Sequence, residues 1–387
     1  MAFARLMVLA LVLAFAATLF ARPAAASDPR PPQLQISFLA EPAPIVQYGA
    51  TKLVYEMAVT NFSKRSYVFD TIEAKAGASR FSFSDTALAG MMAHLGPWDP
   101  VTGPASRTIA AGRSLIVYFM LDLGAEKAPR SIEHTLHVIA DDGGAHDIAL
   151  QPLQVLDEKP IVVAPPLRGV WMAGDSVNNG PDAAHRKTIL ITDGRAWLAQ
   201  RHAIDWVQIQ KVDGAYTTWK GAEDKNESYF CNDQPIYSVG AGKVVGMADG
   251  LPENVPHSGK YAVELSFDNA AGNHVVVEIA PHRYVLYAHM RPGTVRVKVG
   301  DTVGVGQVLG HVGNTGSSTE PHLHMHIVDQ PSFLAGNGLP YAFTAFDASG
   351  PVQADVSSPT AINIGSIGPQ KPFTNDYPAN NAEVTFR

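Results

Sequence analysis

The stretch that decides the fold is Glu320-Pro321-His322-Leu323-His324-Met325-His326-Ile327, in which three histidines alternate with apolar residues. This alternation predicts a β-strand. Successive side chains of a strand point to opposite faces, and each residue advances the chain by about 3.3 Å, so neighbouring histidines would lie about 6.6 Å apart on one face. At that spacing one imidazole can bind a metal ion while the next reaches a water molecule bound to the metal. The stretch therefore predicts a hydrolytic metal site on a strand whose other face packs in a core.

Length and composition frame this prediction. A chain of 387 residues with 46% hydrophobic residues is long enough for two domains with packed cores. Only 17% of the residues are charged and the formal net charge is -7, so the sequence offers no basic surface for a nucleic acid. Cys231 is the single cysteine and cannot form an intramolecular disulfide bond.

The first 26 residues have the pattern of a secretory signal peptide. A short basic start is followed by an apolar run over residues 6–20, and Ala24-Ala25-Ala26 before Ser27 fits a cleavage site. No later apolar run is long enough to span a bilayer. We therefore expect an exported protein, periplasmic or extracellular, with no stable membrane span after cleavage of the signal peptide.

Residues 27–156 are predicted to form an accessory β-sandwich. Short apolar strands separated by turn residues are expected at 53–61, 67–69 and 114–121, with no helical periodicity between them. This spacing resembles immunoglobulin-like accessory domains of exported bacterial proteins. The Pro-rich segment 157–168 is predicted to be a linker. Residues 350–387 are predicted to be a polar C-terminal tail that returns one strand through Val384-Thr385-Phe386.

Residues 169–349 read as a second series of strands, many of them ended by glycine. Asp193-Gly194 predicts a hairpin between an apolar run over 187–192 and a second run from Ala196. Further strands are expected at 235–246, 273–279, 284–290, 295–303 and 306–316. The predicted fold class is therefore all-β.

Several segments of this second domain, in order, resemble the lysostaphin/LytM-type zinc metalloendopeptidases, a family of peptidoglycan hydrolases with the duplicated hybrid motif fold. The segments are Ala203-Ile204-Asp205, the strand from Pro235, Leu286-Tyr287-Ala288-His289-Met290, Val299-Gly300-Asp301-Thr302-Val303, Gly313-Asn314-Thr315-Gly316 and Pro321-His322-Leu323-His324. The resemblance runs from about residue 185 to 345. It implies a compact antiparallel β domain with a groove over one sheet, one zinc ion per chain, and hydrolysis of peptide bonds in peptidoglycan stem peptides or cross-links.

The same resemblance implies a role for each matching residue. Asp205 and His324 would be zinc ligands, and His289 and His322 would activate the water and stabilise the oxyanion. Catalytic zinc commonly has three nitrogen or oxygen ligands from the protein and an open position for water, so one ligand remains to be found.

The sequence departs from the family pattern at this third ligand. The family carries a histidine four residues before the aspartate, on the same strand face, and that position is Arg201 here. His202 would point away from Asp205 unless the strand is bulged. His185 would reach the metal face if a three-residue turn paired it with Ala203. We favour His185, with His202 or no third histidine as alternatives, and expect His326 to lie beside the ligands rather than on the metal.

Two functions are compatible with these residues. The first is an exported zinc metalloendopeptidase that cuts peptidoglycan or another peptide substrate. The alternative is a degenerate, inactive family member that binds the cell wall or activates another wall hydrolase. The persistence of Asp205, His289, His322 and His324 favours the enzyme. The oligomeric state is not indicated by the sequence.

Overall fold

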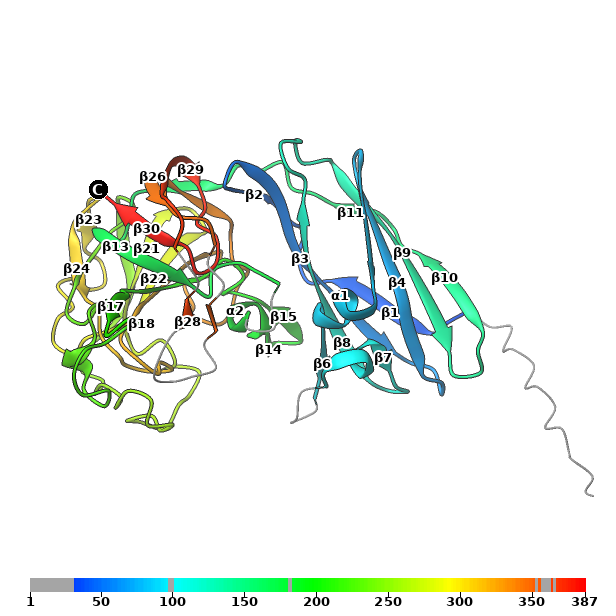
Figure 1. Cartoon of the computed structure of the whole chain (residues 1–387), viewed down its shortest axis with the longest axis horizontal. Helices are drawn as coiled ribbons and strands as arrows, with labels where there is room; N and C mark the ends of the chain where they lie inside the picture. Colours follow the sequence, from blue (N-terminus) through cyan, green and yellow to red (C-terminus); the bar gives the residue numbers. More distant parts are fainter. Residues whose placement is uncertain (1–30, 97–100, 180–182, 352–353, 356–362, 365–366) are drawn as a thin grey trace, which may run out of the picture.

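The computed structural model describes residues 31–96, 101–179, 183–351, 354–355, 363–364 and 367–387, which form two β-rich domains joined side by side (Figure 1). The predicted signal peptide, residues 1–26, lies outside the described residues. Within the described ranges, helices are too short or too polar to cross a bilayer. The all-β prediction is confirmed, because strands dominate both domains.

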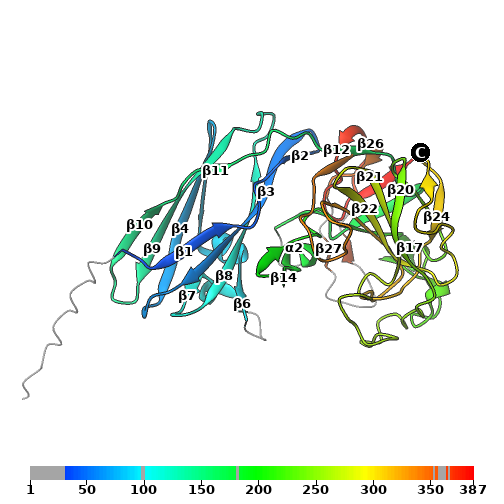
Figure 2. The same cartoon turned by 180° about the vertical axis from the view of Figure 1, so that it is seen from behind.

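The N-terminal domain consists of two antiparallel sheets (Figure 2). The first sheet contains β1 (Leu34–Phe38), β2 (Pro44–Gln47), β3 (Ala50–Asn61), β6 (Met92–Leu95) and β8 (Ser114–Asp122). The second contains β4 (Tyr67–Ala76), β5 (Ser79–Ser84), β7 (Thr108–Ile109), β9 (Ser131–Ala140), β10 (Ala145–Ala149) and β11 (Leu153–Gln154). Helix α1 (Asp85–Gly90) and the 3₁₀ helix η1 (Gly103–Arg107) lie between strands.

Alternation explains why these sheets pack face to face. On β3, Leu53, Tyr55, Met57 and Val59 are all buried in a core that also holds residues of β4, β8 and β9. The side chains between them point to the other face of the sheet. A two-sheet sandwich is therefore present where strands were predicted, and its immunoglobulin-like assignment stays a prediction.

The second domain is built on one large sheet. The sheet contains β12 (Ile161–Val163), β13 (Gly169–Gly174), β16 (Ile204–Val207), β20 (Gly242–Ala248), β21 (Asn273–Ala280), β22 (Arg283–Met290), β23 (Thr302–Val303), β25 (Leu323–Val328), β26 (Tyr341–Ala348), β29 (Lys371–Asp376) and β30 (Glu383–Phe386). Four two-stranded sheets pair β14 (Leu190–Thr192) with β15 (Arg195–Trp197), β17 (Gln210–Val212) with β18 (Ala215–Thr217), β19 (Pro235–Tyr237) with β24 (Val308–His311), and β27 (Ala354–Asp355) with β28 (Asn363–Ile364). The short helices are α2 (Ala184–Lys187) and η2 (Asn226–Ser228).

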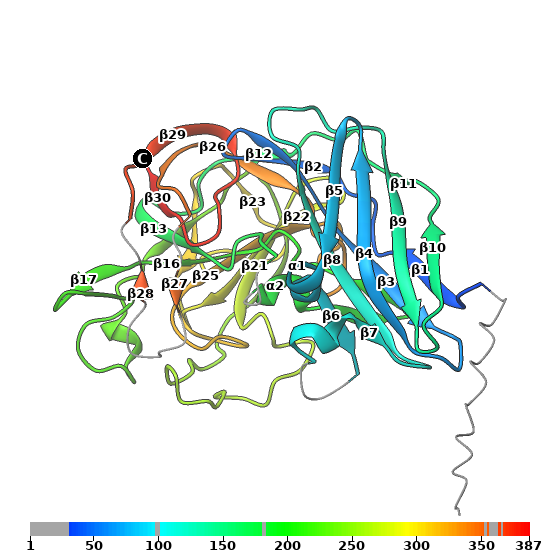
Figure 3. The same cartoon turned by 45° about the vertical axis from the view of Figure 1, so that its right-hand side comes forward.

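Segments outside the predicted catalytic domain contribute to this sheet. Within the segment predicted as a linker, β12 pairs in parallel with β26. From the segment predicted as a polar tail, β30 pairs with both β13 and β26, which confirms the returning strand, and β29 pairs with β26 (Figure 3). The strand expected at 295–303 is wrong for its first part, because that segment approaches β24 through Arg296 N–H and Leu309 O, 2.9 Å apart, without forming a ladder.

The histidine-bearing strand is β25, and its two faces differ as the alternation predicts. Leu323, Met325 and Ile327 are fully buried in the main core of the second domain. His324 and His326 project from the opposite face, next to a smaller apolar cluster around Leu286 and Ala288. The core side therefore fixes the register of β25, and the register places the histidines.

Candidate metal centre

The site is built on the pairing of β16 with β25. Asp205 and His324 are direct cross-strand partners, and Nδ1 of His324 lies 2.9 Å from Oδ1 of Asp205. Side chains opposite each other in an antiparallel pair share one face of the sheet. Two segments separated by 119 residues thus bring a carboxylate and an imidazole into contact.

His322 stands just before β25 and turns its ring toward the same carboxylate. Its Nε2 lies 3.4 Å from Oδ1 of Asp205, and its Nδ1 lies 2.9 Å from the carbonyl oxygen of Glu320. A carbonyl oxygen can only accept, so Nδ1 carries the hydrogen and Nε2 faces the site. The backbone of Glu320 therefore fixes both the orientation and the tautomer of His322.

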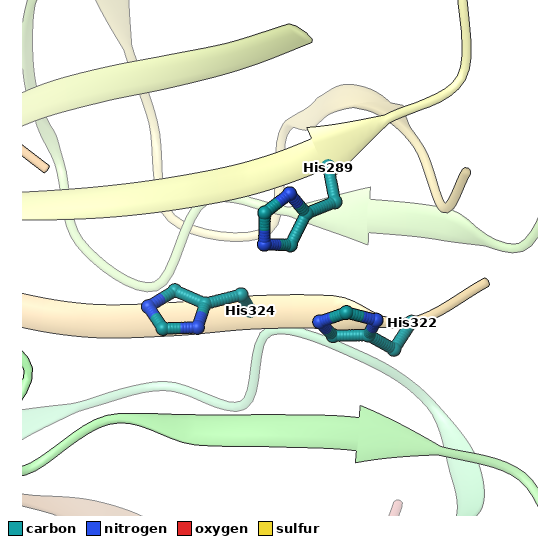
Figure 4. Close-up of side chains that lie close together, drawn as sticks. All are labelled: His289, His322 and His324. Carbon is teal, nitrogen blue, oxygen red and sulfur yellow. The ribbon is translucent and has the colours of Figure 1, made fainter. Parts of the chain in front are cut away.

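His289 enters the site from the neighbouring strand β22. Figure 4 shows its ring directed toward His322 and His324, and the ring centroids lie 4.8 Å and 5.7 Å away, respectively. The residue is buried and has φ of 64°, a left-handed conformation that is uncommon outside glycine. Strained backbone of this kind is concentrated at functional sites. Here it occurs near the strand end, where Nδ1 of His289 donates to the carbonyl oxygen of Thr315 at 2.8 Å.

The Gly313-Asn314-Thr315-Gly316 segment explains how that carbonyl is held. Gly316 has φ of 70°, and a Cβ placed there would meet the backbone nitrogen of Gly272 at 2.3 Å. The Thr315 hydroxyl donates to the carbonyl oxygen of Met290 at 3.0 Å and accepts from the Asn273 N–H at 2.9 Å. The glycines let two loops approach closely enough to fix the acceptor of His289.

His185 is brought beside Asp205, although by a different route from the one predicted. Its Nε2 lies 3.3 Å from Oδ2 of Asp205, and its Nδ1 donates to the carbonyl oxygen of Asp175 at 2.8 Å. The hairpin at Asp193-Gly194 has a two-residue turn and not the three-residue turn that we expected, and its strand β14 begins at Leu190. His185 lies before that strand, on α2. Its position therefore does not depend on how the two strands of the hairpin pair.

His202 lies away from this cluster. It sits in the turn before β16, is 2% exposed, and has its ring against Tyr377, with 6.5 Å between the centroids. Its Nδ1 is buried without a hydrogen-bond partner among the described residues. His202 thus points away from Asp205, as its odd spacing from Asp205 predicted, although β16 itself starts only at Ile204.

His326 and Phe333 complete the surroundings of His324. Nδ1 of His326 lies 2.9 Å from Nε2 of His324, so His324 presents its other nitrogen to Asp205. The Phe333 ring lies 5.1 Å from the ring of His324 and 5.9 Å from that of His289. The sequence did not single out Phe333, Asp175 or the Thr315 carbonyl, because contacts with loops carry no periodic signal.

The carboxylate of Asp205 dominates the electrostatics. Burial raises its pKa, but His185 and His322 outweigh burial and hold the pKa well below its ordinary value. For His185, burial has the opposite effect and lowers the pKa, but Asp205 and Asp175 outweigh burial and raise the pKa to about 9. For His289, burial and the neighbouring histidines lower the pKa well below its usual range. The site thus concentrates negative charge at Asp205, where a cation is stabilised.

Two overlapping sets of ligand atoms in the described part of the chain could hold a metal ion. One is His185, Asp205 and His324, and the other is His289, His322 and His324; in each set the atoms lie within 4.8 Å of one another. The first set contains the carboxylate and comprises two imidazoles and one carboxylate, a known donor set for catalytic zinc. The donor chemistry of His185, Asp205 and His324 therefore fits zinc, and His289 and His322 lie next to this set without belonging to it.

Comparison with known structures gives distant similarities. The catalytic domain of EnpA, a prophage-encoded M23 protein from Enterococcus faecalis whose structure is that of a point mutant, is 20% identical over 46% of this chain and 93% of its own, with a TM-score of 0.26. The catalytic domain of lysostaphin from Staphylococcus simulans is 24% identical over 30% of this chain and 76% of its own, with a TM-score of 0.19. A zinc-containing peptidase from Vibrio cholerae is 16% identical over 77% of this chain and 83% of its own, with a TM-score of 0.21.

A family model gives a direct assignment for part of the second domain. Residues 228–334 match peptidase family M23, and this range contains His289, His322 and His324. Asp205 and His185 lie before the matched range. Residues 228–334 are therefore a domain of peptidase family M23.

Proposed function

We propose that the protein is an exported zinc metalloendopeptidase that hydrolyses peptide bonds in peptidoglycan stem peptides or cross-links. The observation that carries this proposal is the arrangement of two histidines, His289 and His322, around a His185–Asp205–His324 ligand set. The family assignment of residues 228–334 supports a peptidase. The signal-peptide pattern of residues 1–26 supports export.

In this proposal His185, Asp205 and His324 hold one zinc ion. Bound zinc polarises a peptide carbonyl and lowers the pKa of a coordinated water molecule to about 7. Asp175 accepts a hydrogen bond from Nδ1 of His185, and His326 pairs with Nε2 of His324. Partners of this kind fix the orientation of ligand rings and the tautomer that binds a metal.

His289 and His322 are the proposed catalytic residues. Each donates from Nδ1 to a backbone carbonyl, that of Thr315 or Glu320, so each directs Nε2 into the site. A neutral ring accepts a proton from water at Nε2, and a protonated ring donates to a developing oxyanion. The pair can therefore supply both the base and the oxyanion donor that peptide hydrolysis requires.

The experiment is digestion of purified peptidoglycan by the mature chain, followed by detection of newly exposed amino groups. We expect the zinc-loaded protein to expose new amino groups. Chelation of zinc should abolish this activity, and adding zinc back should restore it. A folded, zinc-loaded protein that cuts neither peptidoglycan nor peptides derived from it would contradict the proposal and favour the alternative of an inactive wall-binding or activating protein.

A further inference from the structure

The arginine that replaces the family's first histidine is tied to the other domain. Arg201 lies four residues before Asp205 and is 4% exposed. Its Nε donates to Oε2 of Glu56 at 2.8 Å, and its Nη1 donates to the carbonyl oxygen of Gly338 at 3.3 Å. Glu56 belongs to β3 of the N-terminal sandwich. The position that would carry a ligand in the family carries a domain contact here.

A second arginine, next to the proposed ligand His185, binds the same carboxylate. Nη2 of Arg186 donates to Oε1 of Glu56 at 2.7 Å and to the carbonyl oxygens of Tyr55 and Phe119, each at 3.2 Å. Its guanidinium also lies 5.4 Å from the centre of the Tyr118 ring. These four residues belong to β3 and β8, so Arg186 anchors α2 on the N-terminal domain.

Glu56 gives one carboxylate oxygen to each arginine and is fully buried. Burial raises its pKa, but Arg201 and Arg186 outweigh burial and keep the pKa below its ordinary value. The carboxylate is thus ionised between two cations. Removing it would leave both arginines buried without their shared counter-ion.

Helix α2 depends on such outside contacts because it has only four residues. Isolated helices of this length are unstable in water, so packing must hold them. Arg186 points to the N-terminal domain, while the adjacent His185 points to Asp205. On the other side, the His185 N–H donates to Oδ2 of Asp175 at 2.9 Å. The helix lies between the two domains in Figure 1.

The domain contact extends well beyond this cluster. Ile45 and Val54 of the N-terminal domain are buried in the core of the second domain. The N–H groups of Tyr48 and Gly49 donate to the two oxygens of Asp376, at 2.7 Å and 2.8 Å. An interface with shared core residues and paired buried charges holds the two domains in a defined relation around α2.

We propose that Glu56 of the N-terminal domain is a positioning residue of the metal centre. It acts through Arg186, which holds α2 in place and so brings His185 to Asp205. The N-terminal domain thereby completes a ligand set that the second domain lacks at position 201. This inference rests on the proposed zinc site, and it assigns the accessory domain a part in metal binding rather than only in substrate placement.

The test measures zinc affinity of the full mature chain by competition with a chromophoric chelator. The variants are Glu56→Gln and Arg186→Lys, each alone and combined with His185→Ala. Arg186→Lys keeps the buried charge but removes the planar guanidinium whose Nη2 makes the contacts with Glu56, Tyr55 and Phe119. It provides a second test if Glu56→Gln does not fold. The matched control is Glu158→Gln, which removes an ion pair between the segment that joins the domains and Arg283 and does not involve α2.

We expect Glu56→Gln and Arg186→Lys to weaken zinc binding about 10- to 100-fold, the range found for partners that orient metal ligands. Neither should weaken binding further in the His185→Ala background, because both act through that ligand. Glu158→Gln should bind zinc like the wild type. In the metal-free chain, the His185 amide should exchange its hydrogen faster in Arg186→Lys than in the wild type.

A folded Arg186→Lys chain that binds zinc as tightly as the wild type would overturn the inference. The inference would also be overturned if Glu56→Gln or Arg186→Lys weakened zinc binding by the same factor with and without His185→Ala. Such additive losses of zinc affinity would reflect a general loss of stability. Zinc affinity is measured without substrate, so a wild type that binds zinc but cuts nothing would contradict the peptidase function and leave this inference standing. A wild type that binds no zinc would contradict both.

Discussion

Nε2 of His185 lies 3.3 Å from Oδ2 of Asp205. His185 belongs to helix α2 and Asp205 to strand β16, so strand pairing does not bring the two residues together. In our proposal this contact supplies the third ligand, since the position four residues before Asp205 is an arginine. His185, Asp205 and His324 together offer two imidazoles and one carboxylate that could hold a metal ion.

The first prediction concerns this third ligand. His185→Ala should weaken zinc binding by more than about 100-fold, since it removes a ligand rather than a partner of one. His202→Ala should change zinc affinity little, because that ring packs against Tyr377 and away from Asp205. Chelator competition measures both. Equal losses in the two variants would mean that His202 reaches the metal.

The second prediction separates catalysis from metal binding. His289→Ala and His322→Ala should each lower kcat on peptidoglycan by about 10²–10³, or about 2.7–4 kcal/mol, the usual effect of removing one donor to an oxyanion. Zinc content, measured by elemental analysis, should stay the same, because neither ring belongs to the proposed ligand set. Loss of zinc in either variant would show that ligand and catalytic roles are exchanged.

Much of this site could be predicted from the sequence because it depends on strand alternation. Periodicity places His324 opposite the core face of β25, and the family pattern pairs it with Asp205 on β16. His185 lies beside Asp205 as expected, but on α2 and not on a hairpin strand, so hairpin register could not describe how it is held. Its role as a ligand stays a prediction. Glu56 could not be found at all, because a buried carboxylate on a strand of another domain has no local signal.

The third prediction tests the close approach of the two loops that hold His289. Gly316→Ala adds a Cβ that would meet the Gly272 nitrogen at 2.3 Å, in a left-handed conformation with φ of 70°. Gly306→Ala has a similar φ of 75° with open space around the added Cβ, so it reports the conformational cost alone, about 1–2 kcal/mol.

Denaturant unfolding should therefore show a larger loss of stability for Gly316→Ala than for Gly306→Ala. Hydrolysis should also fall more in Gly316→Ala, because the Thr315 carbonyl that orients His289 would shift. Equal losses of stability and activity in the two variants would show that the loop contact does not matter.

The fourth prediction is a pH dependence of stability in the N-terminal domain. Burial lowers the pKa of His134 to about 4, and its Nε2 lies 2.8 Å from the Tyr55 hydroxyl. The unfolded chain, with the ordinary value of about 6.5, binds more protons than the folded chain between these two values. Stability should therefore fall as the pH drops from about 6.5 to 4, by about 3 kcal/mol in total, at about 1.4 kcal/mol per pKa unit.

The matched variant for this effect is His134→Gln, which cannot take up the proton. Its free energy of unfolding should be lower than that of the wild type at pH 7, and the difference should shrink as the pH approaches 4. Urea unfolding at a series of pH values measures the two curves. Parallel curves across this range would show that His134 does not cause the acid sensitivity.

The most direct test of the zinc site is a crystal structure of the zinc-loaded mature chain, with anomalous diffraction recorded on both sides of the zinc absorption edge. We predict one strong peak per chain, about 2.0–2.2 Å from nitrogen atoms of His185 and His324 and from an oxygen of Asp205, with His289 and His322 nearby but not bound. A peak bound by His202, a peak held by His289 and His322 without Asp205, or no peak in this cluster would contradict it.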